Sequence, residues 1–506
     1  MGAGTVDWKD WKDEDPGLPI KLGPCSNAEY DPEPLPPVLR ETVRLAREAC
    51  ERNARRAGMS RREFLLSICG AATTLLVLDA CTRAAIRATA PGTTPGGTYL
   101  IPTEATTEPE PAHQAIGGEE FVFDVQGHLL EYDLNPILNG QDFWERFPQK
   151  GCGEDDPRVC FSIESFLELM FLRSDTSMLV LSALPIYPEG SPLSPTIMDE
   201  TRRIAEGLCR DDRVLLHGQV LPNVSPSESS LAAMDDVAHR YRIAAWKTFT
   251  HFPDVFEHNG RGWWLDDHDP SLPQVGERFI ERAVRLGVPT ICVHKGLSGG
   301  SPYASPQDIG PAARAHPEAN FVVYHSGFEA GVPEGPYTRR AANVGVNRLI
   351  TSMRRAGIGP NQNVYAELGS TWWYVMRYPD QAAHVLGKLL KHVGEDNVAW
   401  GTDCLFYGSP QDQIQAMRVF QISPEFQERY AYPELTRRIK DKILGLNAAR
   451  LYGVDPITTR CEFTRRELEQ LRRQLPGRNR TLGPSTTAEA AAFRALDHAA
   501  MSTGKA

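Results

Sequence analysis

Residues 121–128 read FVFDVQGH, a short apolar run that ends in a histidine. Four later runs have the same form, and each carries a lysine, a histidine or an aspartate near its end: RIAAWKTF (242–249), PTICVHKG (289–296), FVVYHSGF (321–328) and NVAWGTDC (397–404). Short apolar runs of this kind are typical of buried strands. In a (β/α)8 barrel the carboxyl ends of the strands meet at one mouth, so we expect these polar side chains to lie close together there.

Apolar runs alternate with helical patterns from residue 121 onward. The runs cover 121–128, 178–184, 213–217, 242–249, 289–294, 320–325, 363–368 and 398–403. Segments between them, such as GERFIERAVRLG at 276–287, carry apolar residues at helical spacing and often end at glycine. Eight such units predict an α/β fold, a (β/α)8 TIM barrel, over residues 116–455. No GxGxxG motif follows a strand, which argues against a dinucleotide-binding fold.

The composition excludes several functional classes. The chain has 506 residues, 41% of them hydrophobic, and a net charge of −11, as expected of a globular protein with a sizeable core. Basic runs interleaved with aromatic residues are absent, so we predict no nucleic-acid partner. The ten cysteines include no C-x-x-C pair, which argues against a zinc ribbon.

Segments on both sides of the predicted barrel differ from it in composition. Residues 1–58 form an extension that is rich in proline, aspartate and glycine over 1–35, which predicts disorder, and helical near 36–57. Residues 82–115 have the threonine, proline, glycine and alanine content of a linker. After the barrel, residues 456–506 predict a charged helix and a loose tail.

Residues 59–81 resemble a twin-arginine (Tat) export signal. Arg61-Arg62 and Phe64 precede an apolar stretch, and the tetrapeptide LDAC that ends at Cys81 resembles a lipobox. We therefore expect export by the Tat machinery to the periplasm or cell envelope, with lipidation of Cys81 as an option. Signals of this kind begin near the N-terminus, so translation from either Met1 or Met59 is compatible with the sequence.

Strand geometry predicts which side chains point toward the mouth. Side chains alternate along a strand, so Asp124, Gln126 and His128 are expected to share one face. The same rule places Val323 and His325 on one face of a later strand. We expect both of these faces to be directed into the barrel.

The order of these residues resembles the amidohydrolase superfamily, in particular the amidohydrolase-2 branch that includes aminocarboxymuconate-semialdehyde decarboxylase. That branch has an H-x-H pair on strand one, histidines on strands five and six, and an aspartate in G-T-D on strand eight. The matching positions are Gln126, His128, His294, His325 and Asp403. The resemblance implies a divalent metal held by His128, His294, Asp403 and Gln126, with zinc expected and iron or manganese as alternatives.

Gln126 stands where the family has a histidine. A glutamine binds metal through a neutral carbonyl oxygen, more weakly than an imidazole does. Gln126 is therefore a poor ligand in a working site, a group that contacts the ligands, or the mark of a partly degenerate site. We favour a functional mononuclear site, because the other positions carry competent ligands.

Lys247 falls at the end of the fourth predicted strand. Binuclear members of the superfamily carry a carboxylated lysine there, which bridges two metals. The alternatives are an unmodified lysine that pairs with a substrate carboxylate and an ordinary ion pair at the strand end. Burial lowers the pKa of a lysine and is compatible with each role.

The remaining predicted roles concern the reaction and the substrate. His325, Asp403 and Lys247 are the expected catalytic residues. Glu367 and Asp124 are expected to hydrogen-bond the ligands. The small-molecule substrate is expected to contact a further set of residues on loops that cover the mouth: Trp372, Trp263 and Arg261.

Four functions fit these residues. The first is hydrolysis of an amide, ester or lactone by metal-activated water, and the second is metal-dependent, non-oxidative decarboxylation of an aromatic or unsaturated acid. The others are a binuclear iron oxygenase and a non-catalytic binding protein of the envelope. Metal content distinguishes these functions. A protein without metal favours the binding protein, one zinc ion favours the hydrolase or the decarboxylase, and two iron ions favour the oxygenase. The sequence specifies neither a substrate nor an oligomeric state.

Overall fold

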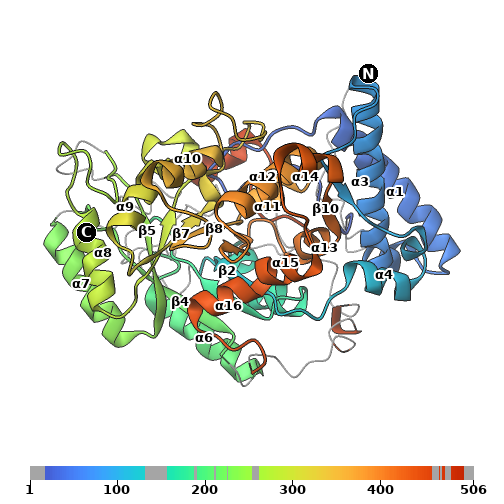
Figure 1. The fold of residues 1–506 in the computed structure, drawn as a ribbon. Coiled ribbons are helices and arrows are strands. Elements are labelled where there is room, and N and C mark those ends of the chain that lie inside the picture. The colour runs from blue at the N-terminus through green and yellow to red at the C-terminus, as the bar shows by residue number, and fades with distance from the viewer. Residues whose placement is uncertain are drawn as a thin grey trace.

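The computed structural model describes residues 17–131, 157–186, 191–209, 212–224, 226–253, 261–458, 467, 470–472 and 480–494. A barrel makes up most of this part of the chain, and N-terminal helices form a layer on one side of it (Figure 1).

Parallel strands form the eight-stranded sheet of the barrel, and their order in space is their order in the sequence. They are β2 (Phe123–Gly127), β3 (Met178–Leu181), β4 (Val214–Gln219), β5 (Ile243–Phe249), β6 (Thr290–His294), β7 (Asn320–Tyr324), β8 (Val364–Glu367) and β9 (Val398–Ala399). The edges meet where the N–H of Val125 donates to the carbonyl of Trp400 (3.0 Å) and the N–H of His128 donates to that of Cys404 (2.7 Å). The predicted TIM barrel is confirmed, and each predicted run overlaps one strand.

Helices cover the outside of the barrel between the strands. Those after β2 are α5 (Ile163–Leu167), α6 (Pro195–Cys209), α7 (Ser227–Arg240), α8 (Gly276–Arg285), α9 (Ile309–Ala315), α10 (Asn347–Ala356), α11 (Thr371–Val375), α12 (Pro379–His392), α13 (Gln411–Val419), α14 (Pro424–Tyr430), α15 (Arg437–Asp441) and α16 (Asn447–Tyr452). In α8, Phe279, Ile280 and Ala283 are buried while Glu277 and Glu281 are exposed. This amphipathic spacing explains why the segment forms a helix that packs on the strands.

Strand residues alternate between the barrel interior and the layer of helices. Ala245, Cys292 and Tyr365, from three different strands, belong to one small cluster inside the barrel. Their neighbours in sequence, such as Trp246 and Val364, belong to the main core between strands and helices. Mostly apolar contacts therefore fill the barrel below its polar mouth.

A bulge in β2 alters the predicted alternation on this strand. The register with β3 shifts between Asp124 and Gly127, so one extra residue lies on β2. Beyond the bulge, Gln126 and His128 both contact Asp403 at the mouth. Asp124 instead accepts a hydrogen bond from the N–H of Thr402 (3.1 Å) across the closing seam of the barrel. The prediction that Asp124 shares a face with the other two residues is therefore wrong.

The N-terminal layer contains α1 (Pro37–Arg56), α2 (Arg61–Leu65), α3 (Ile68–Thr89), β1 (Gly97–Tyr99) and α4 (Pro109–Ile116). The helix predicted near 36–57 is α1, which lies beside α3 (Figure 1), with Asn53 Nδ2 donating to Thr73 Oγ1 (3.1 Å). By length and composition α3 qualifies as a membrane span, and 56% of its most apolar window is buried within the protein.

Residues 82–115 do not form the predicted linker. They contain the end of α3, the strand β1 and α4, and β1 pairs antiparallel with β10 (Phe420–Ile422). Asp79 joins α3 to β1, because it accepts hydrogen bonds from Thr98 Oγ1 (2.7 Å) and the N–H of Tyr99 (2.9 Å). The composition of residues 82–115 suggested a linker, because composition does not reveal pairing with a distant segment such as β10.

Residues 17–35 are packed against the barrel instead of being disordered. Ile20, Leu22 and Cys25 are buried, and Lys21 Nζ forms an ion pair with Asp412 at 2.7 Å. The tail is also ordered over residues 480–494, where Leu482 and Phe493 are buried. The predicted charged helix at 464–475 lies mostly outside the described residues. Only a few buried apolar side chains anchor these segments. Composition averaged over a whole segment hides them, so it wrongly predicted disorder.

Candidate metal centre

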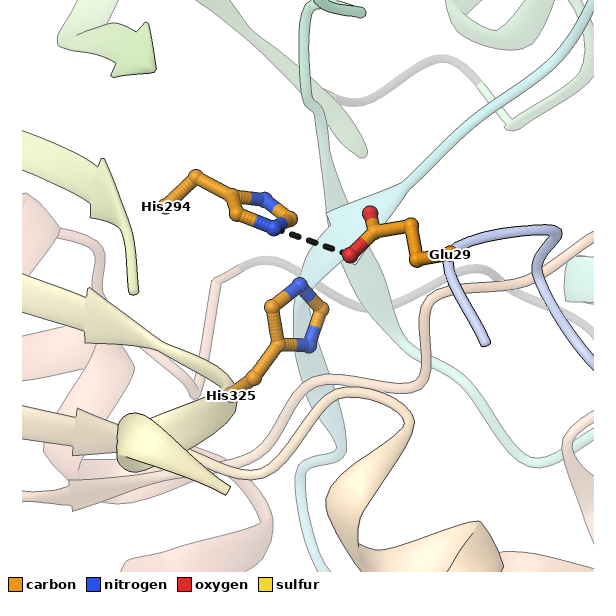
Figure 2. Close-up of side chains that lie close together, drawn as sticks. All are labelled: Glu29, His294 and His325. Atoms are coloured by element: carbon orange, nitrogen blue, oxygen red, sulfur yellow. Dashed lines mark hydrogen bonds and ion pairs between the residues drawn. The ribbon is translucent and has the colours of Figure 1, made fainter. Parts of the chain in front are cut away.

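Two histidines and a glutamate lie together at the mouth of the barrel. His294 ends β6, His325 follows β7, and Glu29 comes from the N-terminal segment (Figure 2). His294 Nε2 lies 2.9 Å from Glu29 Oε2, and the two imidazole rings are 4.5 Å apart between centroids. Among the described residues these three form a group whose ligand atoms all lie within 4.8 Å of one another.

His325 reaches the mouth through a bend in the backbone. Val323 on the same strand packs toward the helices, so alternation alone does not direct His325 into the barrel. Its φ of 62° lies in the left-handed region, as do those of Ser370 (55°) and Asp403 (58°). Non-glycine residues in this region carry strain, and such strain clusters at functional sites.

The ring of His325 has a defined tautomer. Its Nδ1 lies 2.8 Å from the carbonyl oxygen of Gly369, which only accepts, so Nδ1 carries the proton. Nε2 is therefore an unprotonated nitrogen, and within the described part of the chain it is buried with no hydrogen-bond partner. Burial lowers the pKa of His325 to about 4, so the ring is neutral. This nitrogen is free to bind a metal or accept a proton.

Asp403 forms a second group next to the first. Its Oδ1 lies 3.2 Å from His128 Nε2 and accepts from Gln126 Nε2 (3.0 Å), and its Oδ2 accepts from Ser370 Oγ (2.5 Å). Burial opposes ionisation, but the contact with His128 and the hydrogen bond from the Ser370 hydroxyl outweigh it and lower the pKa of Asp403 to about 2. Asp403 is therefore a carboxylate.

The predicted metal ligands divide between the two groups. His294 belongs to the group with Glu29, whereas His128, Gln126 and Asp403 contact one another. The groups are close enough for the charge of Asp403 to act on the pKa of Glu29, which burial raises to about 7.

Lys247 is buried on β5, and none of the described carboxylates forms an ion pair with it. Its Nζ lies 3.3 Å from the centre of the Tyr324 ring, a cation–π contact, and forms no hydrogen bond with the described residues. Burial lowers the pKa of Lys247 to about 8. The structure therefore excludes an ordinary ion pair within the described residues and leaves the lysine available to a ligand.

Glu367 supports the site from inside the barrel. Its Oε2 accepts the N–H of His325 (3.0 Å), and its Oε1 accepts the N–H of Gly369 (2.5 Å). Burial raises the pKa of Glu367 to about 8. Glu367 therefore holds the backbone of His325, while Asp124 holds the neighbouring β2–β9 seam.

The residues predicted to contact substrate are engaged elsewhere. Trp263 and Trp372 are fully buried, and their indole N–H groups donate to the carbonyls of Phe249 (3.2 Å) and Gln413 (2.9 Å). Arg261 is exposed and donates to the carbonyl of Ser271 (2.8 Å). The tryptophans pack the core because their large apolar area is worth more when buried than at an open mouth.

Sequence reasoning missed several polar residues at the mouth. Asn27 Nδ2 donates to Asp403 Oδ2 (2.7 Å), and Ser370 contacts the same oxygen. His251 follows β5, and its ring centre lies 4.9 Å from that of His294. The sequence could have indicated His251, because it lies only two residues beyond the end of β5. Asn27 and Glu29 carry no strand or helix pattern that would have indicated them.

The donor set fits a divalent transition metal. Neutral imidazole nitrogens and carboxylate oxygens are common zinc ligands, and two histidines with one carboxylate also bind iron. A buried polar atom without a partner costs about 1–3 kcal/mol, so the bare Nε2 of His325 also indicates that something binds there. Glu29, His294 and His325 are the residues that would hold the ion, with His128 and Asp403 beside them.

Comparison with known proteins shows the family of the chain. A family model described as "Amidohydrolase" matches residues 192–454, just over half of the chain. The chain belongs to this amidohydrolase family and is an enzyme of the amidohydrolase superfamily. The matched segment includes Lys247, His294, His325 and Asp403 and begins after β3, so Gln126 and His128 lie outside it. A search of curated proteins finds no match.

Three solved structures illustrate what the chain is similar to. One is an uncharacterized TIM-barrel protein from Bordetella bronchiseptica, with a TM-score of 0.41 and 14% identity, covering 66% of this chain and 98% of that one. Another is 2,6-dihydroxybenzoate decarboxylase from Rhizobium, with a TM-score of 0.37, 14% identity and coverage of 66% and 98%. The third is 5-carboxyvanillate decarboxylase from Sphingomonas paucimobilis, with a TM-score of 0.37, 12% identity and coverage of 67% and 100%.

Proposed function

We propose that the protein is a metal-dependent hydrolase that acts on an amide, ester or lactone. The observation that carries this proposal is the neutral Nε2 of His325, which has no hydrogen-bond partner among the described residues. It lies beside His294, at a mouth that also holds ionised Asp403. A bound divalent metal, with zinc expected, supplies Lewis acidity and lowers the pKa of bound water.

The side chains of the mouth divide the remaining tasks. The carboxylate of Asp403 accepts a proton from the attacking water, because its low pKa keeps it ionised at neutral pH. Glu367 fixes the backbone of His325 and so orients its ring toward the substrate. Lys247 lies within the barrel as a cation that neutralises negative charge on the substrate.

Lys247 also favours a second candidate, decarboxylation of an aromatic or unsaturated acid. A buried ammonium group that pairs with no anion in the described part of the chain is suited to bind a substrate carboxylate. The decarboxylases among the similar solved structures are consistent with this alternative.

The experiment is a substrate screen of the zinc- or manganese-loaded enzyme. The panel contains aryl esters, lactones and cyclic amides, assayed by acid release, and hydroxybenzoic acids, assayed by release of carbon dioxide. Turnover of the first group that His294→Ala abolishes supports the hydrolase. Turnover of the acids alone supports the decarboxylase and contradicts the leading proposal.

We also propose that the protein is exported by the Tat machinery. The support is the sequence around Arg61-Arg62 and the apolar helix α3 that follows it. Cys81 lies within α3 and is half-buried, so a lipid anchor there requires the helix to open.

A further inference from the structure

A short turn at residues 26–30 carries two polar side chains into the mouth of the barrel. Ser26 Oγ accepts the N–H of Ala28 (2.9 Å) and donates to the carbonyl of Tyr30 (2.5 Å), and Asn27 Oδ1 accepts the N–H of Glu29 (3.1 Å). Ala28 has a φ of 72°, in the left-handed region that reverses the chain. The turn is therefore defined by its own side chains.

Buried contacts on both sides hold this turn in place. Before it, the side chains of Lys21 and Asp412 pair at 2.7 Å with exposed fractions of 5% and 1%. Within it, the hydroxyl of Tyr30 lies 3.2 Å from that of Tyr407, and the N–H of Ser26 donates to the carbonyl of Pro484 (2.9 Å). Breaking a buried ion pair costs about 3–5 kcal/mol, so the Lys21–Asp412 pair holds this segment firmly against the barrel.

Each of the two side chains contacts one group of the metal centre. Asn27 donates to Asp403 (2.7 Å), and Glu29 Oε2 lies 2.9 Å from His294 Nε2. Glu29 Oε2 also accepts the N–H of Ser298 (3.2 Å), which fixes its position. The carboxylate therefore faces Nε2 of His325, as Figure 2 shows, the nitrogen for which the described residues provide no hydrogen-bond partner.

At the mouth end of β2 the barrel carries the neutral side chain of Gln126 and not a carboxylate. The Oε1 atoms of Gln126 and Glu367 both crowd the place that a Cβ on Gly369 would take, at 2.0 and 2.6 Å from it. The side chain of Gln126 therefore lies close to that of Glu367. Its amide donates to Asp403 (3.0 Å) and so takes the part of a hydrogen-bond donor at this position.

We propose that Glu29, from outside the barrel, is the carboxylate ligand of the metal, and that Asn27 positions Asp403. This inference rests on the proposed metal-dependent function. If Glu29 is a ligand, residues 17–36 belong to the active site. The predicted targeting segment at 59–81 connects these residues to the barrel, so it stays attached in the active protein.

The test is the zinc affinity of the full-length protein, measured by competition with a chromogenic chelator. Glu29→Gln keeps the shape of the side chain and removes its charge, and we expect it to weaken zinc binding about tenfold or more. The matched control is Glu33→Gln on the same segment, because Glu33 is exposed and accepts a hydrogen bond from the hydroxyl of Tyr374 (3.2 Å), away from the metal centre. Cobalt-loaded protein gives a second readout, since loss of a ligand changes its visible spectrum.

His294→Ala distinguishes a failure of the Glu29 proposal from a failure of the metal centre itself. Weakened binding in Glu29→Gln and His294→Ala, with Glu33→Gln unchanged, supports the inference. Wild-type affinity and an unchanged cobalt spectrum in folded Glu29→Gln overturn it, and loss of metal from His294→Ala in the same experiment leaves the proposed function standing. That combination would mean that Glu29 occupies the place of a substrate carboxylate. Unchanged binding in His294→Ala overturns the metal centre itself.

Discussion

The carboxylate of Glu367 occupies the space that a side chain on Gly401 would need. A Cβ at position 401 would lie 1.7 Å from Glu367 Oε1. Because Glu367 also accepts the N–H of His325, the glycine in the G-T-D run and the histidine of the metal centre are linked through one buried carboxylate.

Gly401→Ala should therefore lower both stability and metal affinity. Displacing a fully buried carboxylate in a packed interior costs about 1–3 kcal/mol of unfolding free energy. Urea unfolding and zinc titration measure the two effects. The control is Gly335→Ala, since nothing lies within 4 Å of a Cβ at that position. Equal stability of the two variants would contradict the role assigned to Gly401.

Acid sensitivity should depend on Asp175. Burial alone would raise the pKa of this carboxyl, but Arg418 at 2.7 Å and Arg472 at 3.0 Å hold it well below its ordinary value of 3.8. The folded state therefore binds fewer protons than the unfolded state, and this stabilisation is present above pH 3.8 and lost as the pH falls below it.

Asp175→Asn should lower the unfolding free energy by about 1–3 kcal/mol at neutral pH and flatten its decline in acid. Denaturant unfolding at neutral and acidic pH measures both. Asp236→Asn, which removes an exposed pair with Arg240, is the control and should change little. An acid profile of Asp175→Asn that is parallel to the wild type would refute the assignment.

Lys247→Ala tests whether the centre holds one metal or two. We expect the metal content to stay the same and KM to rise about tenfold, because a cation that binds substrate is lost. Lys391→Ala on the exposed side of α12 is the control. A fall of the metal content to half would show instead that Lys247 is carboxylated and bridges two ions.

Export should depend on the paired arginines. Arg61 and Arg62 changed together to lysine keep the charge and remove the guanidinium groups, so the protein should remain in the cytoplasm. Cell fractionation measures this, and export of the lysine variant would disprove the Tat route. Mass spectrometry of the exported protein should find residues 17–36 still attached.

Strand periodicity was enough to predict the barrel and the polar residues that end or follow several of its strands. His294 and Asp403 could be found because each ends or follows an apolar run. The exact direction of the side chains could not be predicted, since a bulge turns Gln126 and a positive φ turns His325. Alternation assumes a regular strand, and both departures occur at the mouth.

The contribution of the N-terminal segment could not be predicted at all. Glu29 meets His294 across 265 residues of sequence, and the segment around it has a composition typical of disorder. Its order depends on partners such as Asp412 and Tyr407, which are adjacent only after the barrel has folded. The tryptophans Trp263 and Trp372 show the opposite error, because they were predicted to contact the substrate and instead pack in the core. Paired aromatic residues at loop positions serve packing as readily as binding.

The central claim is that His294 belongs to a metal centre, and metal analysis of protein purified without chelators tests it most directly. We predict one equivalent of divalent metal in the wild type. His294→Ala should be folded, with an unchanged circular dichroism spectrum, and should contain little metal and have no activity. A wild-type protein that holds no stoichiometric metal, together with a fully active His294→Ala variant, would contradict the account.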